Sequence, residues 1–210
     1  MTDLTGAVTG EIDEETRLLV AIAYGEASKD DIPDEISGVA HAVANRARAW
    51  GNKSISALLK AEPDYAKAAN GDNVRFNVLI IAKLCDINKN TGMKIAVNSA
   101  KEALKGEGVD PSNGAFWWDG TDFKEFYNTH PKVAAGFRFG ESSHNIFGVK
   151  EKRVPVTVSC IKENKKTHKK TKIIMGAYTS VWVSTAAYGQ TIFWKYDEEY
   201  LKATRGKTYR

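Results

Sequence analysis

The sequence predicts an α+β fold, in which a mainly helical lobe comes first and a smaller antiparallel β-rich lobe lies towards the C-terminus. Apolar residues recur at helical spacing behind good N-cap residues through residue 106. A strong turn sequence at 110–114 (DPSNG) then ends the helical pattern. After Val154 the residues Val156, Val158 and Cys160 alternate with polar ones, as they do in half-buried strands, and this change predicts the second lobe.

Helices are expected at five places in the first half of the chain. Asp13 suits the N-cap of a first helix, which should end near or just past Gly25. Pro33 suits position N1 of a second helix, whose apolar positions recur up to Trp50. Three further helices are expected to start at caps Ser54, Asn73 and Thr91 and to reach Leu59, Leu84 and Gly106.

The second half is expected to be largely extended. Residues 115–118 form a predicted extended segment, which a turn at Asp119 and Gly120 closes. Antiparallel strands are expected over 154–160, over 173–183 and, after a turn at Tyr188 and Gly189, over 191–194.

A single domain is expected, because 210 residues suffice for one substantial core and no repeat or linker divides the chain. No apolar run approaches the roughly 18 residues of a membrane-spanning helix, so no membrane insertion is expected. Residues 1–15 contain no lysine or arginine, and no export signal is visible in them. Cys85 and Cys160 have apolar neighbours, so both are expected to be buried, without a disulfide or a catalytic role.

The net charge of +4 combines two unlike parts of the chain. Residues 1–150 carry 17 basic and 21 acidic side chains, whereas residues 151–210 carry 13 basic and 5 acidic ones. This basic segment favours an anionic partner, either nucleic acid, an acidic membrane surface or a wall polymer. Its lysine run at 162–172 is expected to be a solvated hairpin tip or a docking site for anionic polymer. Nucleic acid is disfavoured, because no aromatic residues alternate with the lysines.

Glu26 is the candidate for acid chemistry. It directly follows an apolar helical run and a glycine that permits close approach of other groups. It is either an exposed glutamate at a helix end or a partly desolvated carboxyl group. In the second case it would keep its proton near neutral pH, as a general acid for glycosidic cleavage must.

Three other places carry candidate binding residues. Asn45 and Arg46 lie either on a solvated helix face or at a site where they form hydrogen bonds with a sugar or support a neighbouring carboxylate. The rings of the aromatic run that ends in Trp117 and Trp118 cannot all face the same core, because successive side chains of a strand point to opposite faces. With Asp119 it forms either core packing or the wall of a carbohydrate cleft. His144, next to Asn145, would position substrate or serve a structural role.

Other enzyme classes lack their motifs in this sequence. The four histidines show no zinc-binding spacing. There is also no Gly-rich phosphate loop, no Gly-x-Ser-x-Gly elbow and no cysteine in an activating setting. We therefore expect neither a metal site nor a cofactor.

Five segments lie in an order and at a spacing that resembles one known family. They are residues 23–27 (AYGEA), 38–46 (GVAHAVANR), 54–59 (SISALL), 103–106 (ALKG) with 110–115 (DPSNGA), and 144–147 (HNIF). In the spore cortex-lytic, SleB-like family of cell wall hydrolases, a helix that ends in the catalytic glutamate precedes a second helix that closes on Asn-Arg. The chain is similar to this family from about Thr16 to Phe147.

The resemblance implies a lysozyme-like muralytic fold that cleaves the MurNAc to GlcNAc bond of peptidoglycan glycan strands, as a muramidase or a lytic transglycosylase. Residues 13–150 would be the cell wall hydrolase core of a single catalytic domain, and residues 151–210 a basic β-rich extension. Glu26 would be the catalytic acid. The residues expected to bind substrate are Tyr24, Asn45, Arg46, Trp117, Trp118, Asp119, His144 and Asn145.

Several alternatives stay open at this point. A second catalytic carboxylate has five candidates, namely Asp64, Asp72, Asp119, Asp122 and Glu141. The alternative functions are a peptidoglycan amidase or peptidase and a non-catalytic wall-binding module. The chain is expected to act as a monomer on the cell wall, in the periplasm of a target cell or outside cells. It would be the excised domain of a larger protein, a phage lysin or an antibacterial effector with a cognate immunity protein.

Overall fold

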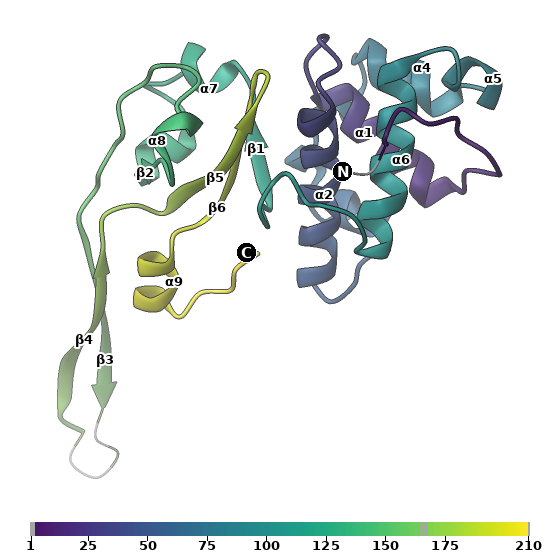
Figure 1. Ribbon diagram of the computed structural model, residues 1–210. Helices are drawn as coiled ribbons and strands as arrows, with labels where there is room; N and C mark the ends of the chain where they lie inside the picture. The colour runs from purple at the N-terminus through teal and green to yellow at the C-terminus, as the bar shows by residue number, and fades with distance from the viewer. Residues whose placement is uncertain (1–2, 164, 166–167, 210) are drawn as a thin grey trace.

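The structure, a computed structural model, describes residues 3–163, 165 and 168–209, and it confirms the α+β class. A helical lobe lies beside a β-rich lobe, and a long hairpin projects away from both (Figure 1). Among the described residues, none of the helices combines the length and the apolar character that crossing a membrane requires.

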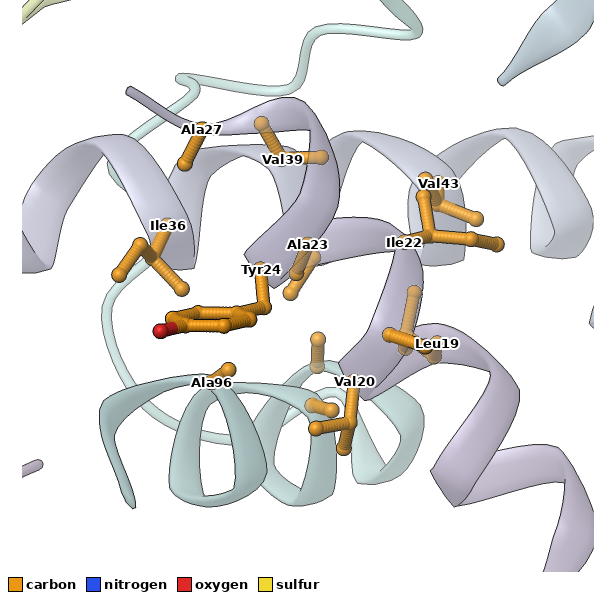
Figure 2. Packing of buried hydrophobic residues seen from close by; sticks show 14 of the residues in the cluster. Leu19, Val20, Ile22, Ala23, Tyr24, Ala27, Ile36, Val39, Val43 and Ala96 are labelled. Carbon is orange, nitrogen blue, oxygen red and sulfur yellow. The ribbon is translucent and has the colours of Figure 1, made fainter. Parts of the chain in front are cut away.

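The helical lobe is built on three helices that pack on one another. They are α1 (Glu14–Glu26), α2 (Pro33–Ala49) and α6 (Thr91–Lys105). Smaller helices cover them, namely α3 (Ile55–Ala61), η1 (Pro63–Tyr65), η2 (Lys67–Asn70), α4 (Val74–Ile81) and α5 (Leu84–Ile87). Figure 2 shows the core between α1, α2 and α6, into which the ring of Tyr24 points.

The predicted helix starts are largely confirmed. The side chains of Asp13, Ser54 and Asn73 each accept a hydrogen bond from a backbone N–H of the first turn. The cap of α6 is Asn90 rather than Thr91, which is the first helical residue. The helix predicted behind Asn73 is shorter than expected, because Leu84 belongs to the separate helix α5.

A four-stranded sheet forms the centre of the β-rich lobe, in the order β1-β6-β5-β2. Its strands are β1 (Trp117–Asp119), β2 (Phe137–Arg138), β5 (Trp182–Tyr188) and β6 (Thr191–Tyr196). The pairs β1–β6 and β5–β6 are antiparallel, but β2–β5 is parallel, so the sheet is mixed and not purely antiparallel as predicted. The long connection between β2 and β5 makes a parallel pairing feasible. Short helices α7 (Asp122–Glu125), α8 (Pro131–Ala135) and η3 (Ser142–His144) lie in the same lobe.

The single strand predicted over 173–183 is in fact two strands in different sheets. Strand β4 (Lys170–Tyr178) pairs with β3 (Val156–Glu163) in the projecting hairpin, whereas β5 belongs to the central sheet. The chain bends between them, where the hydroxyl of buried Ser180 donates to Asp197 at 2.9 Å. Helix α9 (Glu198–Thr204) follows and packs on β4.

The residues after 150 are not simply an extension, because β5 and β6 are the two inner strands of the central sheet. Phe193 of β6 is fully buried and packs against α2 of the other lobe. A Cβ on Gly38 would lie 2.5 Å from the tip of that ring, so glycine is needed for this close approach. The outer part of the β3–β4 hairpin projects away from the two lobes (Figure 1).

A buried carboxylate joins the two lobes. Glu35 on α2 is fully buried and accepts hydrogen bonds from the Ser28 hydroxyl at 2.5 Å, the Gln190 N–H at 3.1 Å and the Thr191 hydroxyl at 2.8 Å. These three donors compensate for its desolvation. The turn between β5 and β6 is thereby fixed to the segment that directly follows Glu26.

The prediction of two buried cysteines is wrong, since both are exposed and free. Cys85 lies on the four-residue helix α5 at the surface. Cys160 lies in the outer part of the hairpin strand, where residues 159–163 are all exposed. Apolar neighbours in sequence do not bury a residue whose element has no packing partner.

Candidate active site

A cleft of about 690 Å³ lies where the two lobes meet. The helical lobe contributes the end of α1, one residue of α2 and the segment around η1 and η2. The β-rich lobe contributes β1, the turn after it, the first residue of α7 and one lysine of α8. The lining residues are Glu26, Arg46, Glu62, Pro63, Asp64, Tyr65, Lys67, Trp117, Trp118, Asp119, Gly120, Thr121, Asp122 and Lys132.

Glu26 is the last residue of α1, and its carboxyl group is held by one donor from each lobe. Its Oε1 accepts a hydrogen bond from the backbone N–H of Ala68 at 2.6 Å. Its Oε2 accepts one from the indole Nε1–H of Trp118 at 3.2 Å. Because both oxygens are held, the group has a fixed orientation at the wall of the cleft.

The pKa of Glu26 is raised, and burial is the main cause. The hydrogen bonds from Ala68 and Trp118 act in the opposite direction, as does the positive charge of Lys67. The negative charge of Asp122 raises the pKa further. The balance makes Glu26 a carboxylic acid that retains its proton to a higher pH than an exposed glutamate does.

Gly25 allows this arrangement to form. A Cβ at this position would lie 2.9 Å from the Cβ of Ala68 and 3.0 Å from the Cβ of Phe76. Any larger residue would push η2 and α4 away from the end of α1. The glycine therefore brings the backbone N–H of Ala68 within reach of Glu26, as its place in the sequence suggested.

Three aromatic side chains line the cleft, Trp117 and Trp118 from β1 and Tyr65 from η1. The two tryptophans pack against different buried clusters, as alternation along a strand requires. Trp118 meets Tyr65 edge to face, with 5.2 Å between ring centroids. Both tryptophans are only partly buried, so they serve as packing and as cleft wall together.

Arg46 lies between two of these rings, with its guanidinium carbon 4.4 Å from the Tyr65 centroid and 4.6 Å from the Trp117 centroid. It is almost fully buried and forms an ion pair with Glu62. Sequence reasoning missed Glu62, because no periodic pattern surrounds it and only the fold brings it to Arg46. The structure thus places Arg46 in the cleft as a support for a neighbouring carboxylate.

The five candidates for a second carboxylate separate into two groups. Asp64, Asp119 and Asp122 line the cleft, whereas Asp72 and Glu141 line other hollows.

The three acids in the cleft differ in their partners. Asp119 lies between Lys132 at 2.8 Å and His130 at 3.4 Å. Asp122 pairs with Lys67 at 3.0 Å, and this lysine lowers the pKa of Asp122 against the effect of burial. Asp64 is exposed at the edge of the cleft.

Tyr24 and Asn45, which were predicted to bind substrate, lie away from the cleft because their side chains are engaged inside the protein. Tyr24 is buried in the helical core, and Arg75 covers its ring with the guanidinium carbon 3.7 Å from the centroid. Asn45 donates to the side chain of Asp110 at 2.8 Å and to the carbonyl of Ala115 at 3.3 Å. It therefore fixes the turn sequence that leads into β1.

His144 and Asn145 also lie outside the cleft. The Nδ1 of His144 is 2.8 Å from the hydroxyl of Ser184, which connects η3 to the central sheet. Asn145 exchanges two hydrogen bonds with the backbone of Val149 and so closes a turn. The hydrogen bond of His144 fits the structural role that the sequence left open for it, and neither residue lines the cleft.

In the described part of the chain, no three side chains of His, Cys, Asp or Glu are grouped so that they could hold a metal ion. Comparisons with protein-family models, with curated proteins and with solved structures found no match. The interpretation of the cleft therefore depends on its own geometry.

Proposed function

We propose that this protein cleaves the glycan strands of peptidoglycan at the MurNAc to GlcNAc bond, with Glu26 as the general acid. The main support is the carboxyl group of Glu26, whose pKa is raised by burial and which is oriented in a cleft with aromatic walls. The aromatic faces of Trp117 and Trp118 suit the apolar faces of sugar rings. The polar groups around them suit hydroxyl and acetamido groups.

Protonated Glu26 would donate its proton to the glycosidic oxygen as the bond from that oxygen to C1 of MurNAc breaks. The electron pair of this bond leaves with the oxygen, which becomes a hydroxyl of GlcNAc. The electron-deficient C1 is then attacked, either by water or by the 6-hydroxyl of the same sugar. The 6-hydroxyl loses its proton to Glu26, which completes the cycle, whereas the proton of an attacking water passes to Glu26 or to a second carboxylate that acts as the base.

The surroundings of the other cleft acids favour attack by the substrate's own hydroxyl, which is the lytic transglycosylase reaction. Glu62, Asp119 and Asp122 are each engaged in an ion pair. Attack by water requires a second carboxylate, which lies about 5 to 5.5 Å from the acid when it is the nucleophile and about 6.5 to 9.5 Å from it when it is the base. Asp64 is the cleft acid best suited to that alternative, since it is exposed.

The test of the proposal is a digest of purified peptidoglycan, followed by mass spectrometry of the soluble fragments. Internal attack gives anhydro-muramyl ends, which are lighter by one water than the reducing ends that hydrolysis gives. Reducing ends would direct the search to Asp64. An amidase or peptidase would leave the glycan intact and cut peptides, and a binding module would release nothing.

The hydrogen bond from Trp118 to Glu26 should affect the pH dependence of the cleavage rate. Trp118→Phe keeps an aromatic ring but removes the indole N–H, which lowers the pKa of Glu26. The pKa of Glu26 should therefore rise further, so the alkaline limb of the pH–rate profile should move to higher pH. Trp117→Phe is the matched control, and its alkaline limb should stay in place even if its rate changes. Identical limbs in the two variants would contradict this role.

Chelators should leave the activity unchanged, because proton donation by a glutamate needs no metal. The measurement is the rate of peptidoglycan solubilisation with and without EDTA. Complete loss with EDTA and recovery with zinc would instead support the amidase alternative.

A further inference from the structure

The projecting hairpin is anchored at its base and uncovered beyond it. Helix α9 packs on β4, where a Cβ on Gly176 would lie 2.8 Å from the Cα of Ala203. Past this contact, residues 159–163 and 170–174 are exposed. Figure 1 shows that this part of the hairpin extends away from both lobes. A two-stranded ribbon of this kind has little stabilisation of its own in water.

The exposed part of the hairpin is strongly basic. Its described lysines are Lys162, Lys165, Lys169, Lys170 and Lys172, and all of them are exposed. Glu163 is the acid among these described residues, and it contacts His168 at 3.0 Å. The run contains lysines and no arginine. A lysine ammonium group is attracted by negative charge in general, whereas an arginine guanidinium group matches the planar shape of a particular anion. Lys166 and Thr167, which belong to the run in sequence, lie outside the described residues.

The positive charges occupy both faces of the ribbon. Residues paired across the two strands share a face, and neighbours along a strand lie on opposite faces. Lys170 and Lys172 therefore lie on one face, about 7 Å apart along the strand, and Lys162 lies on the other.

The exposed isoleucines are divided in the same way. Ile161 and Ile174 share the face of Lys172, and Ile173 lies on the opposite face. A single flat protein surface cannot cover both faces of a ribbon. A flexible polyanion can pass around it and contact both.

We propose that the β3–β4 hairpin is a docking arm for a linear phosphodiester polymer of the cell wall. Such a chain carries one negative charge in each repeat, and this closely spaced charge complements Lys170 and Lys172. The carboxylates of peptidoglycan peptides are dispersed through a network and complement the ribbon less well. The inference relies on the proposed function for the location of the polymer, but the binding itself is independent of catalysis.

The experiment measures cosedimentation of the full chain with purified walls that retain their phosphodiester polymer. The same walls stripped of that polymer with hydrofluoric acid are the comparison. The test variant replaces Lys162, Lys169, Lys170 and Lys172 by glutamine. The matched control replaces four exposed lysines of the helical lobe, Lys60, Lys83, Lys89 and Lys105, by glutamine, so that both variants lose the same charge. All proteins carry Glu26→Gln to limit digestion of the walls, and fragments in the supernatant report any cleavage that persists.

We expect the hairpin variant to bind intact walls roughly tenfold more weakly than the parent at low salt. The control variant should stay close to the parent. The difference should shrink between about 50 and 300 mM salt, since exposed charges are screened. Equal binding of the two variants, or parent binding that survives removal of the polymer, would overturn the proposal. So would tighter binding of the arm to single-stranded DNA than to intact walls. Cleavage that persists at a high rate in these Glu26→Gln proteins would contradict the proposed function instead, whatever the walls bind.

Discussion

Replacing Glu26 by glutamine should lower the rate of peptidoglycan cleavage by about two to four orders of magnitude. The amide keeps the size and the hydrogen-bonding reach of the side chain but has no proton to donate at working pH. The measurement is the initial rate of fragment release at saturating substrate. Glu141→Gln is the matched control, because Glu141 lies outside the cleft, and it should retain the parent rate. A fully active Glu26→Gln variant would remove Glu26 from the mechanism.

The same variant should keep its fold, and its stability should depend on pH in a defined direction. The pKa of Glu26 is raised in the folded protein, so the wild type loses stability relative to the variant as pH rises through that pKa. Below the pKa of an unfolded glutamate the two proteins should differ little. Thermal melting at several pH values measures this, and a melting temperature of the variant far below wild type would attribute its inactivity to unfolding.

Phe193→Ala should destabilise the protein by about 3 to 5 kcal/mol, because it removes a fully buried aromatic ring and leaves a cavity. The free energy of unfolding of a typical domain is about 5 to 15 kcal/mol, so the effect is a large fraction of it. It is expected because β6 packs on α2 through this ring and therefore contributes to the common core. Denaturant unfolding of the full chain measures the change in the free energy of unfolding.

Ile174→Ala is the control for this measurement, since Ile174 is 70% exposed on the hairpin. Its free energy of unfolding should stay within about 0.5 kcal/mol of wild type. A loss below about 1 kcal/mol for Phe193→Ala would indicate that the segment after 150 is added to a core that is complete without it.

The sequence predicted the helical lobe well, because its signals are local. The caps Asp13, Ser54 and Asn73 act on the N–H groups of the next turn, so three or four residues suffice to recognise each helix start. Gly25 is also a local signal, because a glycine next to Glu26 at a helix end indicates that other groups approach closely there.

The sheet could not be predicted, because its pairings join segments far apart in the chain. Strand β1 pairs with β6 and the two-residue strand β2 pairs with β5, and no local pattern encodes either partner. The break between β4 and β5 depends on the tertiary hydrogen bond from Ser180 to Asp197. The residues of 173–183 do not by themselves indicate this tertiary contact.

Only part of the site was predicted from the sequence. A motif groups residues that are adjacent in sequence, but in a helix the side chains of adjacent residues point in different directions. Successive residues of a helix are rotated by about 100°, and residues two apart by about 200°. Tyr24 therefore faces the core while Glu26 faces the cleft, and Asn45 fixes a turn while Arg46 lines the cleft. The contact of Glu62 with Arg46 could be recognised only in the folded structure.

The most direct test of the central claim is a parallel digest of one peptidoglycan preparation by the wild type and by Glu26→Gln, with the cut bonds identified by mass spectrometry. We expect the wild type to release glycan fragments that end in muramyl residues with their peptides intact. The glutamine variant should release almost none. Peptide cuts by the wild type, or muramyl-ended fragments in equal amounts from both proteins, would contradict the claim that Glu26 is the acid of a glycan-cleaving enzyme.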